Sequence, residues 1–262
     1  MKFVSHILLR TYEYVVFYLG MLQIGLLCLA WSLLGLLLFP LMPTAAGRLL
    51  GRAGIRAIFR IFLTTVAWSG RFRFDLRELD AIKHEESIII APNHPSMWDV
   101  ALIVSRLPNV ACVVKADIMK NIFLGGGSRL AGYIRNDSLR RMIALAVDDL
   151  KGGGRLLLFP EGTRTTRAPI GPLVGSIGLI AARAQVPVQT VLIETDSPFL
   201  GKGWPIYKVP RLPLTYRVRL GRRFDAPHDG NVLMAELAEY FAEALVRPAA
   251  TVLQPQVETV TN

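Results

Sequence analysis

The sequence predicts an α/β fold, in which a mostly parallel sheet is flanked by helices and preceded by an N-terminal membrane-associated helical segment. Three observations support this prediction. The run Tyr14–Phe39 contains no charged residue, an arginine repeat follows it, and short apolar runs alternate with amphipathic stretches from about residue 70. We therefore divide the chain into membrane-anchoring helices (1–69), an α/β domain (70–247) and a flexible tail (248–262).

The composition is that of a protein that meets a membrane. Hydrophobic residues make up 52% of the chain, the mean hydropathy is +0.39 and the formal net charge is +10. A basic surface suits nucleic acid, anionic lipid headgroups or acidic carrier proteins. The sequence contains no Lys/Arg-rich run of the kind that binds nucleic acid, so we expect membrane lipids as partners and no nucleic acid.

The charge-free run Tyr14–Phe39 is long enough to cross a bilayer at 1.5 Å per residue. Pro40 and Pro43 end it without the small-residue cleavage pattern of a signal peptide, so we expect an uncleaved anchor. The arginine-rich side after the anchor favours the cytoplasm. Because Lys2 and Arg10 precede the anchor, a hairpin inserted into one leaflet fits as well as a full span.

A second helix is expected over residues 48–68. Arg48, Arg52, Arg56 and Arg60 recur every four residues, and apolar residues fill the other face. This pattern is typical of a basic amphipathic helix that lies at a lipid interface. The alternative is a helix packed on the main domain with a solvated arginine stripe.

The remainder of the chain alternates between strand and helix patterns, which favours a largely parallel sheet. Strands are predicted at Arg71–Leu76, Ser87–Ala91, Val110–Lys115, Gly132–Ile134, Arg155–Phe159, Val188–Glu194 and Leu214–Leu220, and helices near Trp98–Ser105, Ser138–Leu150, Ser176–Ala184 and Asn231–Leu245. The glycine run 152–154 is interpreted as a helix stop with a tight turn, and the run 125–127 as a loop. Sites in such sheets form where the carboxyl ends of strands open into loops.

Polar residues follow the predicted strand 87–91 at once: Asn93, His94, Ser96 and Asp99. A neutral imidazole can take a proton from an attacking alcohol, and a carboxylate on its other ring nitrogen fixes the tautomer. A helix that begins near Ser96 places Asp99 in its first turn, within reach of His94. The alternatives are a capped helix with an incidental histidine, and a hydrolase that uses Ser96, although no G-x-S-x-G motif surrounds that serine.

A second polar cluster follows the predicted strand 155–159. Gly162 allows a tight turn, and Thr163 and Arg164 offer hydroxyl and guanidinium donors. An arginine can bind a phosphate through two hydrogen bonds. Glu161 can accept hydrogen bonds from ligand hydroxyls or from Arg164. The alternative is a turn with a surface salt bridge.

Cysteines and histidines show no metal-ligand spacing. Cys28 and Cys112 lie in apolar surroundings without a CxxC partner, so we expect free buried thiols. The four histidines form no metal-spaced cluster. We therefore expect no bound metal.

The two polar clusters in this order resemble the motifs of the glycerolipid acyltransferases. The matching stretches are Asn93-His94-Pro95-Ser96-Met97-Trp98-Asp99 and Phe159-Pro160-Glu161-Gly162-Thr163-Arg164. The sequence is most similar to the bacterial single-domain 1-acylglycerol-3-phosphate acyltransferases. Val186-Pro187-Val188 resembles a further short motif of the family, and the resemblance spans roughly residues 50 to 220. It implies that 70–247 is an acyltransferase domain.

The resemblance implies a membrane-bound O-acyltransferase that moves an acyl group from acyl-CoA or acyl carrier protein to a lysolipid hydroxyl. Lysophosphatidate is the leading acceptor, with phosphatidate as product. His94 would be the general base and Asp99 its orienting partner. The implied substrate-binding residues are Asn93, Ser96, Glu161, Gly162, Thr163, Arg164 and Arg135. No cofactor beyond the acyl donor is implied, and we expect a bacterial inner membrane location with the active site facing the cytoplasm.

One position departs from the family pattern, which places an arginine six residues after a glycine. Counting from Gly132, the sixth residue here is Ser138, with Arg135 earlier and Arg140 later. Either arginine would bind the acceptor phosphate from a different backbone path. Alternatively, the acceptor is another lysolipid or a lipid-linked alcohol without a phosphomonoester. A serine lipid hydrolase and a non-catalytic lipid-binding module are the competing functions.

Overall fold

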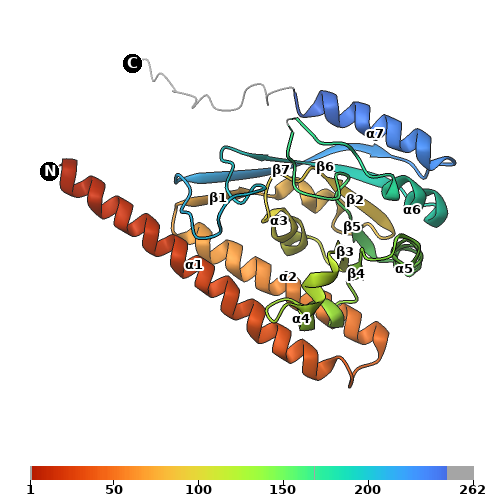
Figure 1. Cartoon of the computed structure of the whole chain (residues 1–262), viewed down its shortest axis with the longest axis horizontal. Coiled ribbons are helices and arrows are strands. Elements are labelled where there is room, and N and C mark those ends of the chain that lie inside the picture. Colours follow the sequence, from red (N-terminus) through yellow and green to blue (C-terminus); the bar gives the residue numbers. More distant parts are fainter. Residues whose placement is uncertain (1, 168, 247–262) are drawn as a thin grey trace, which may run out of the picture.

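The computed structural model describes residues 2–167 and 169–246, and the tail predicted for 248–262 lies outside these residues. Two long helices, α1 (Lys2–Leu38) and α2 (Thr44–Trp68), form a hairpin beside an α/β domain (Figure 1). The domain is built on a seven-stranded sheet with the strand order β1-β7-β6-β2-β5-β3-β4.

All seven predicted strands are present in the sheet, with ends that differ from the prediction by a few residues. They are β1 (Phe72–Asp75), β2 (Ile88–Pro92), β3 (Val110–Val114), β4 (Ile134–Arg135), β5 (Arg155–Leu157), β6 (Val188–Thr195) and β7 (Leu214–Phe224). The helices of the domain are α3 (Asp99–Arg106), α4 (Gly125–Leu130), α5 (Leu139–Lys151), α6 (Ser176–Ala184) and α7 (Gly230–Ala244), with short 3-10 helices η1 (Arg77–Ile82) and η2 (Ala116–Lys120).

The sheet is mostly parallel, as predicted. Strands β6, β2, β5, β3 and β4 run in one direction, whereas β7 is antiparallel to β6 and β1 is parallel to β7. The carboxyl ends of the five parallel strands therefore meet at one edge of the sheet, which we call the carboxyl edge. The opposite end, where those five strands begin, is the amino edge.

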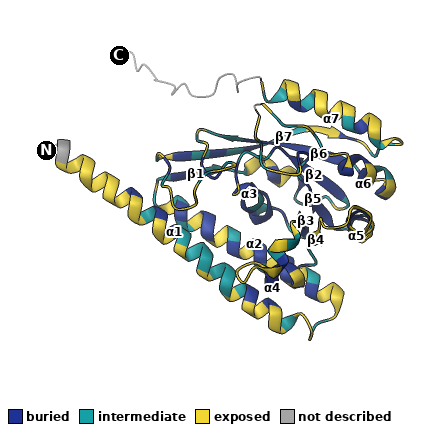
Figure 2. Ribbon diagram, in the orientation of Figure 1, coloured by how far each residue is buried: buried dark blue, intermediate teal, exposed yellow. Residues whose placement is uncertain are grey.

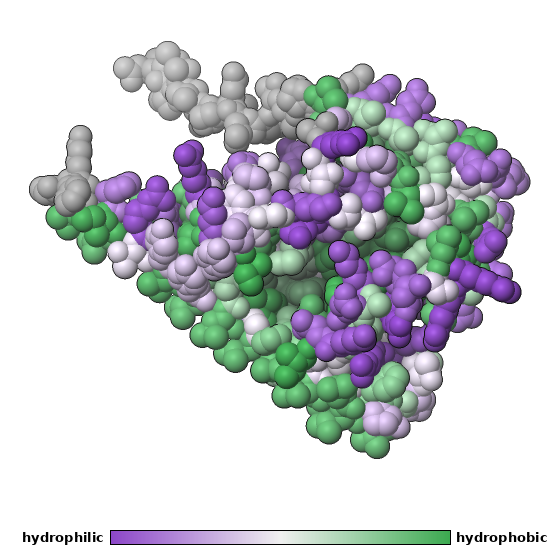
Figure 3. All heavy atoms as spheres, in the orientation of Figure 1, coloured by the Kyte–Doolittle hydropathy of each residue, from purple (hydrophilic) through white to green (hydrophobic). Residues whose placement is uncertain are grey.

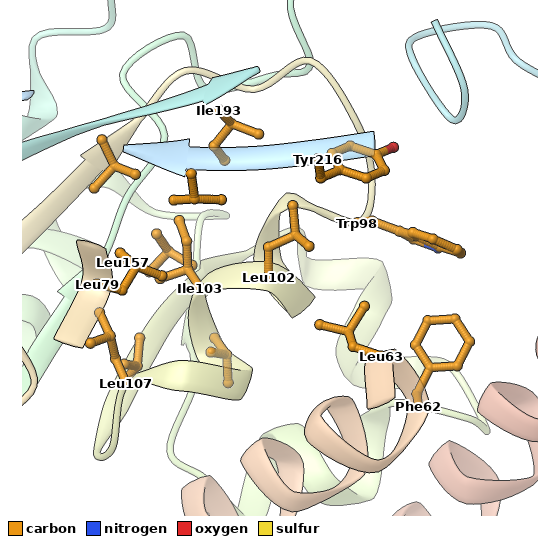
Figure 4. Packing of buried hydrophobic residues seen from close by; sticks show 14 of the residues in the cluster. Phe62, Leu63, Leu79, Trp98, Leu102, Ile103, Leu107, Leu157, Ile193 and Tyr216 are labelled. Carbon is orange, nitrogen blue, oxygen red and sulfur yellow. The ribbon is translucent and has the colours of Figure 1, made fainter. Parts of the chain in front are cut away.

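Two hydrophobic clusters cover the two faces of the sheet. Along β2 the side chains alternate between them, with Ile90 in the cluster under α2 and α3, and Ile89 and Ala91 in the cluster under α5, α6 and α7. Figure 4 shows the first cluster, in which Leu102 and Ile103 of α3 point toward strands β6 and β7. Burial of each such side chain stabilises the fold by about 1.5–3 kcal/mol.

Helix α1 leaves most of its apolar surface uncovered. By length and composition it can cross a membrane, and only 17% of its most apolar stretch is buried. Figure 2 shows exposed residues along its outer side. Among the exposed apolar residues of the helix, Leu37 is 67% exposed. The helix begins well before the predicted run Tyr14–Phe39 and ends at its penultimate residue.

Helix α2 packs against the domain, and two of the four arginines in its predicted stripe bond to other parts of the protein. Arg52 is only 4% exposed, and it forms an ion pair with Asp149 of α5 and donates to the Ala131 carbonyl at 3.0 Å. Arg56 donates to the Arg106 carbonyl at the end of α3. The prediction of an interfacial basic stripe is therefore wrong for these two arginines, because their partners lie on distant parts of the chain.

The glycine run 125–127 was expected to be a loop, but it forms the start of helix α4. The run allows close approach of α4 to α1, since a Cβ atom on Gly126 would lie 1.8 Å from the carbonyl oxygen of Ser32. The Gly126 amide donates to the Ser32 hydroxyl at 2.9 Å. The other run behaves as predicted, because α5 ends at Lys151 and Gly153 adopts a positive φ of 83°.

Candidate active site

The loop between β2 and α3 is fixed to the neighbouring strand by Asn93. Its side-chain amide donates to the Ile193 carbonyl at 3.0 Å, and its carbonyl oxygen accepts from the Ile193 amide at 2.7 Å. The side chain thus continues the pairing of β2 with β6 beyond the end of the strand. His94, the next residue, is held at the carboxyl edge of the sheet.

His94 and Asp99 are in contact. The Nδ1 atom of His94 lies 2.8 Å from Oδ2 of Asp99, which also accepts from the Ser96 amide at 2.8 Å. Asp99 is fully buried in the first turn of α3, whereas the side chain of His94 is 14% exposed. Within the described residues the other Asp99 oxygen, Oδ1, is buried without a hydrogen-bond partner.

Asp99 is ionised at neutral pH, although its burial opposes the charge. Burial raises the pKa of Asp99 to about 6, while the hydrogen bond and charge of His94 and the Ser96 amide oppose this rise. Arg164 also lowers this pKa through its charge. An ionised Asp99 places the imidazole proton on Nδ1, so that Nε2 has a free lone pair for a proton.

Ser96 does not have the geometry of a nucleophile. It is fully buried, and its hydroxyl oxygen accepts from the Trp98 amide at 3.2 Å and from the Tyr216 hydroxyl at 2.9 Å. Its contact with His94 is indirect, through the amide that binds Asp99. The hydrolase alternative therefore lacks a reactive serine here, and the predicted substrate contacts of Asn93 and Ser96 compete with bonds inside the protein.

The second motif closes over the histidine. After β5, the ring of Phe159 stacks on the His94 imidazole with centroids 3.7 Å apart and an interplanar angle of 17°. The Thr165 amide donates to the His94 carbonyl at 2.8 Å. Between these contacts, Gly162 has a φ of 63° and its amide bonds to the Phe159 carbonyl, which turns the chain. The two motifs thus form one site.

Two charged residues of the second motif hold loops within the protein. Glu161 is buried and accepts from the Thr165 hydroxyl at 2.5 Å and from the Gly171 amide at 2.8 Å. Arg164 donates to the Leu200 and Gly201 carbonyls, each at 2.9 Å. The predicted alternative of a Glu161–Arg164 pair is not formed. The sequence did not predict the contact with the loop at 200–201, because a residue of any type can supply a main-chain carbonyl acceptor.

Gly162 and Thr163 are exposed at the tip of the second motif, and Arg135 is exposed at the end of β4. Strand β4 lies three positions from β2 in the sheet, which is roughly 14 Å at the usual strand spacing. Arg135 pairs with Asp137, and Ser138 caps α5 by accepting from the Arg141 amide. Ser138, at the position of the family arginine, therefore has a structural role.

Metal-ligand groupings are not apparent around this site. Within 2–167 and 169–246, no group of three or more His, Cys, Asp or Glu side chains is placed to hold a metal ion. Cys112 is free and buried in β3, and burial raises the pKa of its thiol to about 12. Cys28 is free and partly buried on α1.

Comparison with known proteins agrees with this site. Residues 73–194, which contain both motifs, match the family model described as Acyltransferase. Over 239 residues the chain is 26% identical to the 1-acyl-sn-glycerol-3-phosphate acyltransferase of Pseudomonas aeruginosa, covering 88% of this chain and 89% of that protein. The crystal structure of the 1-acyl-sn-glycerophosphate acyltransferase of Thermotoga maritima has the same fold, with a TM-score of 0.60, 19% identity and coverage of 94% of this chain and 96% of that one.

The fold and the paired histidine and aspartate thus define an α/β enzyme domain. Residues 73–194 match the Acyltransferase family model, and the protein is an acyltransferase. The family resemblance predicted from the two motifs is confirmed.

Proposed function

We propose that the protein is a membrane-bound O-acyltransferase that converts 1-acyl-sn-glycerol-3-phosphate into phosphatidate with acyl-CoA or acyl carrier protein as donor. The contact between His94 and Asp99 is the observation that carries this proposal, because it leaves Nε2 of a slightly exposed imidazole free to accept a proton. The relative from Pseudomonas aeruginosa supports the acceptor through its name.

The acyl transfer follows from this geometry as a direct displacement. Nε2 of His94 takes the proton of the acceptor hydroxyl while its oxygen attacks the thioester carbonyl carbon. Asp99 stabilises the imidazolium that forms. The tetrahedral intermediate collapses, the C–S bond breaks, and the imidazolium returns the proton to the sulfur. An ester and a free thiol result, and no protein nucleophile is acylated.

The acceptor headgroup is assigned to exposed groups that follow strands β5 and β4 at the carboxyl edge. Thr163 supplies a hydroxyl and Arg135 a guanidinium, while Gly162 gives close access to the main chain. Glu161 and Arg164 hold the second motif in place through their bonds to Gly171, Leu200 and Gly201, so they act on the headgroup mainly by positioning the loop. All of these residues lie along the carboxyl edge.

Membrane attachment is proposed from the apolar surface at the same side of the molecule. The outer face of α1 is hydrophobic in Figure 3, and exposed Ile122 and Phe123 come from the segment between η2 and α4. Tyr18 of α1 donates to the carbonyl of exposed Tyr207, which ties a loop after β6 to this helix. Both loops follow strands that end at the carboxyl edge, and Figure 3 shows the face hollowed near its middle.

The location at a bacterial inner membrane, with the active site toward the cytoplasm, remains part of this proposal. It is supported by the arginines that follow α1 in sequence.

The decisive assay offers full-length protein a panel of lysolipids with acyl-CoA or acyl carrier protein, and measures free thiol. We expect release with lysophosphatidate, and a loss of about 10²–10⁴-fold in His94→Ala. His228→Ala removes a histidine outside the site and serves as the matched control. Release that depends on no acceptor, or an active His94→Ala variant, would refute acyl transfer at this site.

A different acceptor is the second candidate, because Ser138 caps α5 where the family carries an arginine. If lysophosphatidate is inert while another lysolipid or a lipid-linked alcohol reacts, the phosphomonoester assignment is wrong and the acyl transfer stands.

A further inference from the structure

The turn that joins α3 to β3 is held by three arginine side chains from other parts of the chain. Two of them come from α2. Arg56 donates to the Arg106 carbonyl at 3.3 Å, where α3 ends. Arg52 donates to the side-chain oxygen of Asn109 at 2.8 Å. Arg155, which begins β5, donates to a further carbonyl of the turn at 2.8 Å. We call Arg52, Arg56 and Arg155 the arginine clamp.

The arginine clamp connects this one turn to several elements that are distant in sequence. Arg52 and Arg155 are each only 4% exposed. Arg52 also forms an ion pair with the buried Asp149 of α5, and Arg155 donates to the Lys83 carbonyl at 2.9 Å. The clamp therefore joins α2, α5, β5 and the segment before β2 to the end of α3, at the amino edge of the sheet.

The clamp is not arranged for the greatest possible stability. The Nε atoms of Arg56 and Arg155 and the Oδ2 atom of Asp149 are buried, and among the residues that the structure describes they have no hydrogen-bond partner. Buried charges are costly to desolvate, and replacing them by apolar side chains is often neutral or stabilising. Three guanidinium groups around one turn therefore favour a role in fixing its geometry.

The element that this turn fixes is α3, whose other end carries Asp99. The helix has eight residues and is about 12 Å long, and residues 101–105 are all buried. At its start, Oδ2 of Asp99 lies 2.8 Å from Nδ1 of His94. His94 is held separately, because the loop that carries it is tied to β6 through Asn93. A shift of α3 along its axis would therefore change the distance between the two catalytic side chains.

We propose that the arginine clamp is a positioning device for catalysis, which sets the distance between Asp99 and His94 by fixing the end of α3. The clamp lies at the opposite edge of the sheet from His94, so it acts through the helix and not on the substrate. This inference rests on the proposed role of His94 as the general base. It makes α2 a part of the catalytic framework.

The test changes Asn109, because Arg52→Ala would leave the buried Asp149 unpaired and destabilise the whole fold. Asn109 has a positive φ of 51°, so Asn109→Gly keeps the backbone conformation and removes the side-chain acceptor of Arg52. In the thiol-release assay we expect kcat to fall about tenfold with KM within about twofold, because displaced catalytic groups act on the transition state. Asn109→Asp restores an oxygen acceptor and should return kcat to within about twofold of the wild type.

The matched control is Gln185→Gly. Gln185 also has a positive φ, 54°, in a helix–strand turn at the amino edge. Its side chain donates to the Ala182 and Pro227 carbonyls, so its loss disturbs α6 and the segment before α7. We expect its kcat to stay within about twofold of the wild type. An Asn109→Gly variant as active as the wild type, or an equal fall of kcat in both glycine variants, overturns the proposal.

A second measurement does not depend on turnover. In the full-length protein labelled with 15N-histidine, NMR reports which imidazole nitrogen of His94 carries the proton, and His94→Ala identifies the signal. The wild type and Gln185→Gly should show the Nδ1–H form. Asn109→Gly should show a mixture of tautomers, because the carboxylate no longer accepts the Nδ1 proton at full strength.

A pure Nδ1–H form in all three proteins overturns the positioning role. If the wild-type protein transfers no acyl group, the proposed function fails, and the NMR comparison alone decides whether the clamp positions the pair.

Discussion

Two regions of the molecule hold charged side chains in opposite ways. At the carboxyl edge, Asp99 is fixed by His94 and the Ser96 amide, and Glu161 by Thr165 and Gly171. In the groove lined by α2, η1 and the end of α3, several cations lie together with one carboxylate among them. A group that moves a proton must be oriented before the substrate arrives. The two carboxylates of the carboxyl edge are oriented in this way by two hydrogen bonds each.

The largest loss of activity is expected from Asp99→Asn. This variant tests whether the carboxylate acts by fixing the orientation of His94. The amide no longer favours a proton on Nδ1, so Nε2 loses its role as proton acceptor. We expect kcat to fall by roughly three to four orders of magnitude with folding retained. Asp148→Asn, which changes an exposed aspartate on α5, is the control in the same thiol-release assay and should be near wild type.

The second test uses pH. Because burial raises the pKa of Asp99 to about 6, the His94–Asp99 pair gains a proton below that pH, and kcat/KM should fall about tenfold per pH unit.

The contribution of Asp99 to the free energy of unfolding changes with pH in the opposite direction. A folded pKa above the ordinary 3.8 gives stability that is complete below pH 3.8 and is lost as pH rises through about 6. A decline in activity without unfolding between pH 7 and 5, followed by circular dichroism, fits this assignment; a flat profile contradicts it.

A smaller effect is expected for Arg135→Gln. Loss of an exposed guanidinium at the carboxyl edge should raise KM for lysophosphatidate about tenfold and leave kcat within about twofold, because the headgroup loses a charge-assisted contact. Arg140 lies five residues further along, in the first turn of α5. Comparing Arg140→Gln with Arg135→Gln shows which of the two arginines replaces the arginine of the family pattern. If Arg140→Gln raises KM and Arg135→Gln does not, the phosphate lies nearer α5.

The smallest effect on catalysis is expected for Ser96→Ala. The hydroxyl accepts from Tyr216 and Trp98 inside the protein, so its loss should cost about 1–3 kcal/mol of unfolding free energy and change kcat by less than about twofold. Chemical denaturation and thiol release measure the two quantities on one preparation. A catalytic loss as large as that of His94→Ala would restore the serine hydrolase alternative.

Sequence reasoning succeeded where a contact is local. The spacing from His94 to Asp99 placed the carboxylate in the first turn of a helix, and the alternation of apolar runs predicted every strand. The second motif was recognisable only through its order after the first and the family resemblance, and the structure places it after the strand beside β2.

It failed where the partner is distant in sequence. Arg52 looked like part of a lipid-facing stripe, but its partner is Asp149, 97 residues away. Gly126 looked like a loop residue, and only the proximity of Ser32 explains why a glycine is needed within a helix. The sequence also did not predict that β7 runs antiparallel to β6, since apolar residues alternate in the same way in parallel and antiparallel strands.

The hydrogen bond from the Thr165 amide to the His94 carbonyl joins main-chain atoms only. Side chains at the exposed tip of the second motif can therefore be exchanged without loosening the His94 loop, provided that position 165 keeps an amide hydrogen.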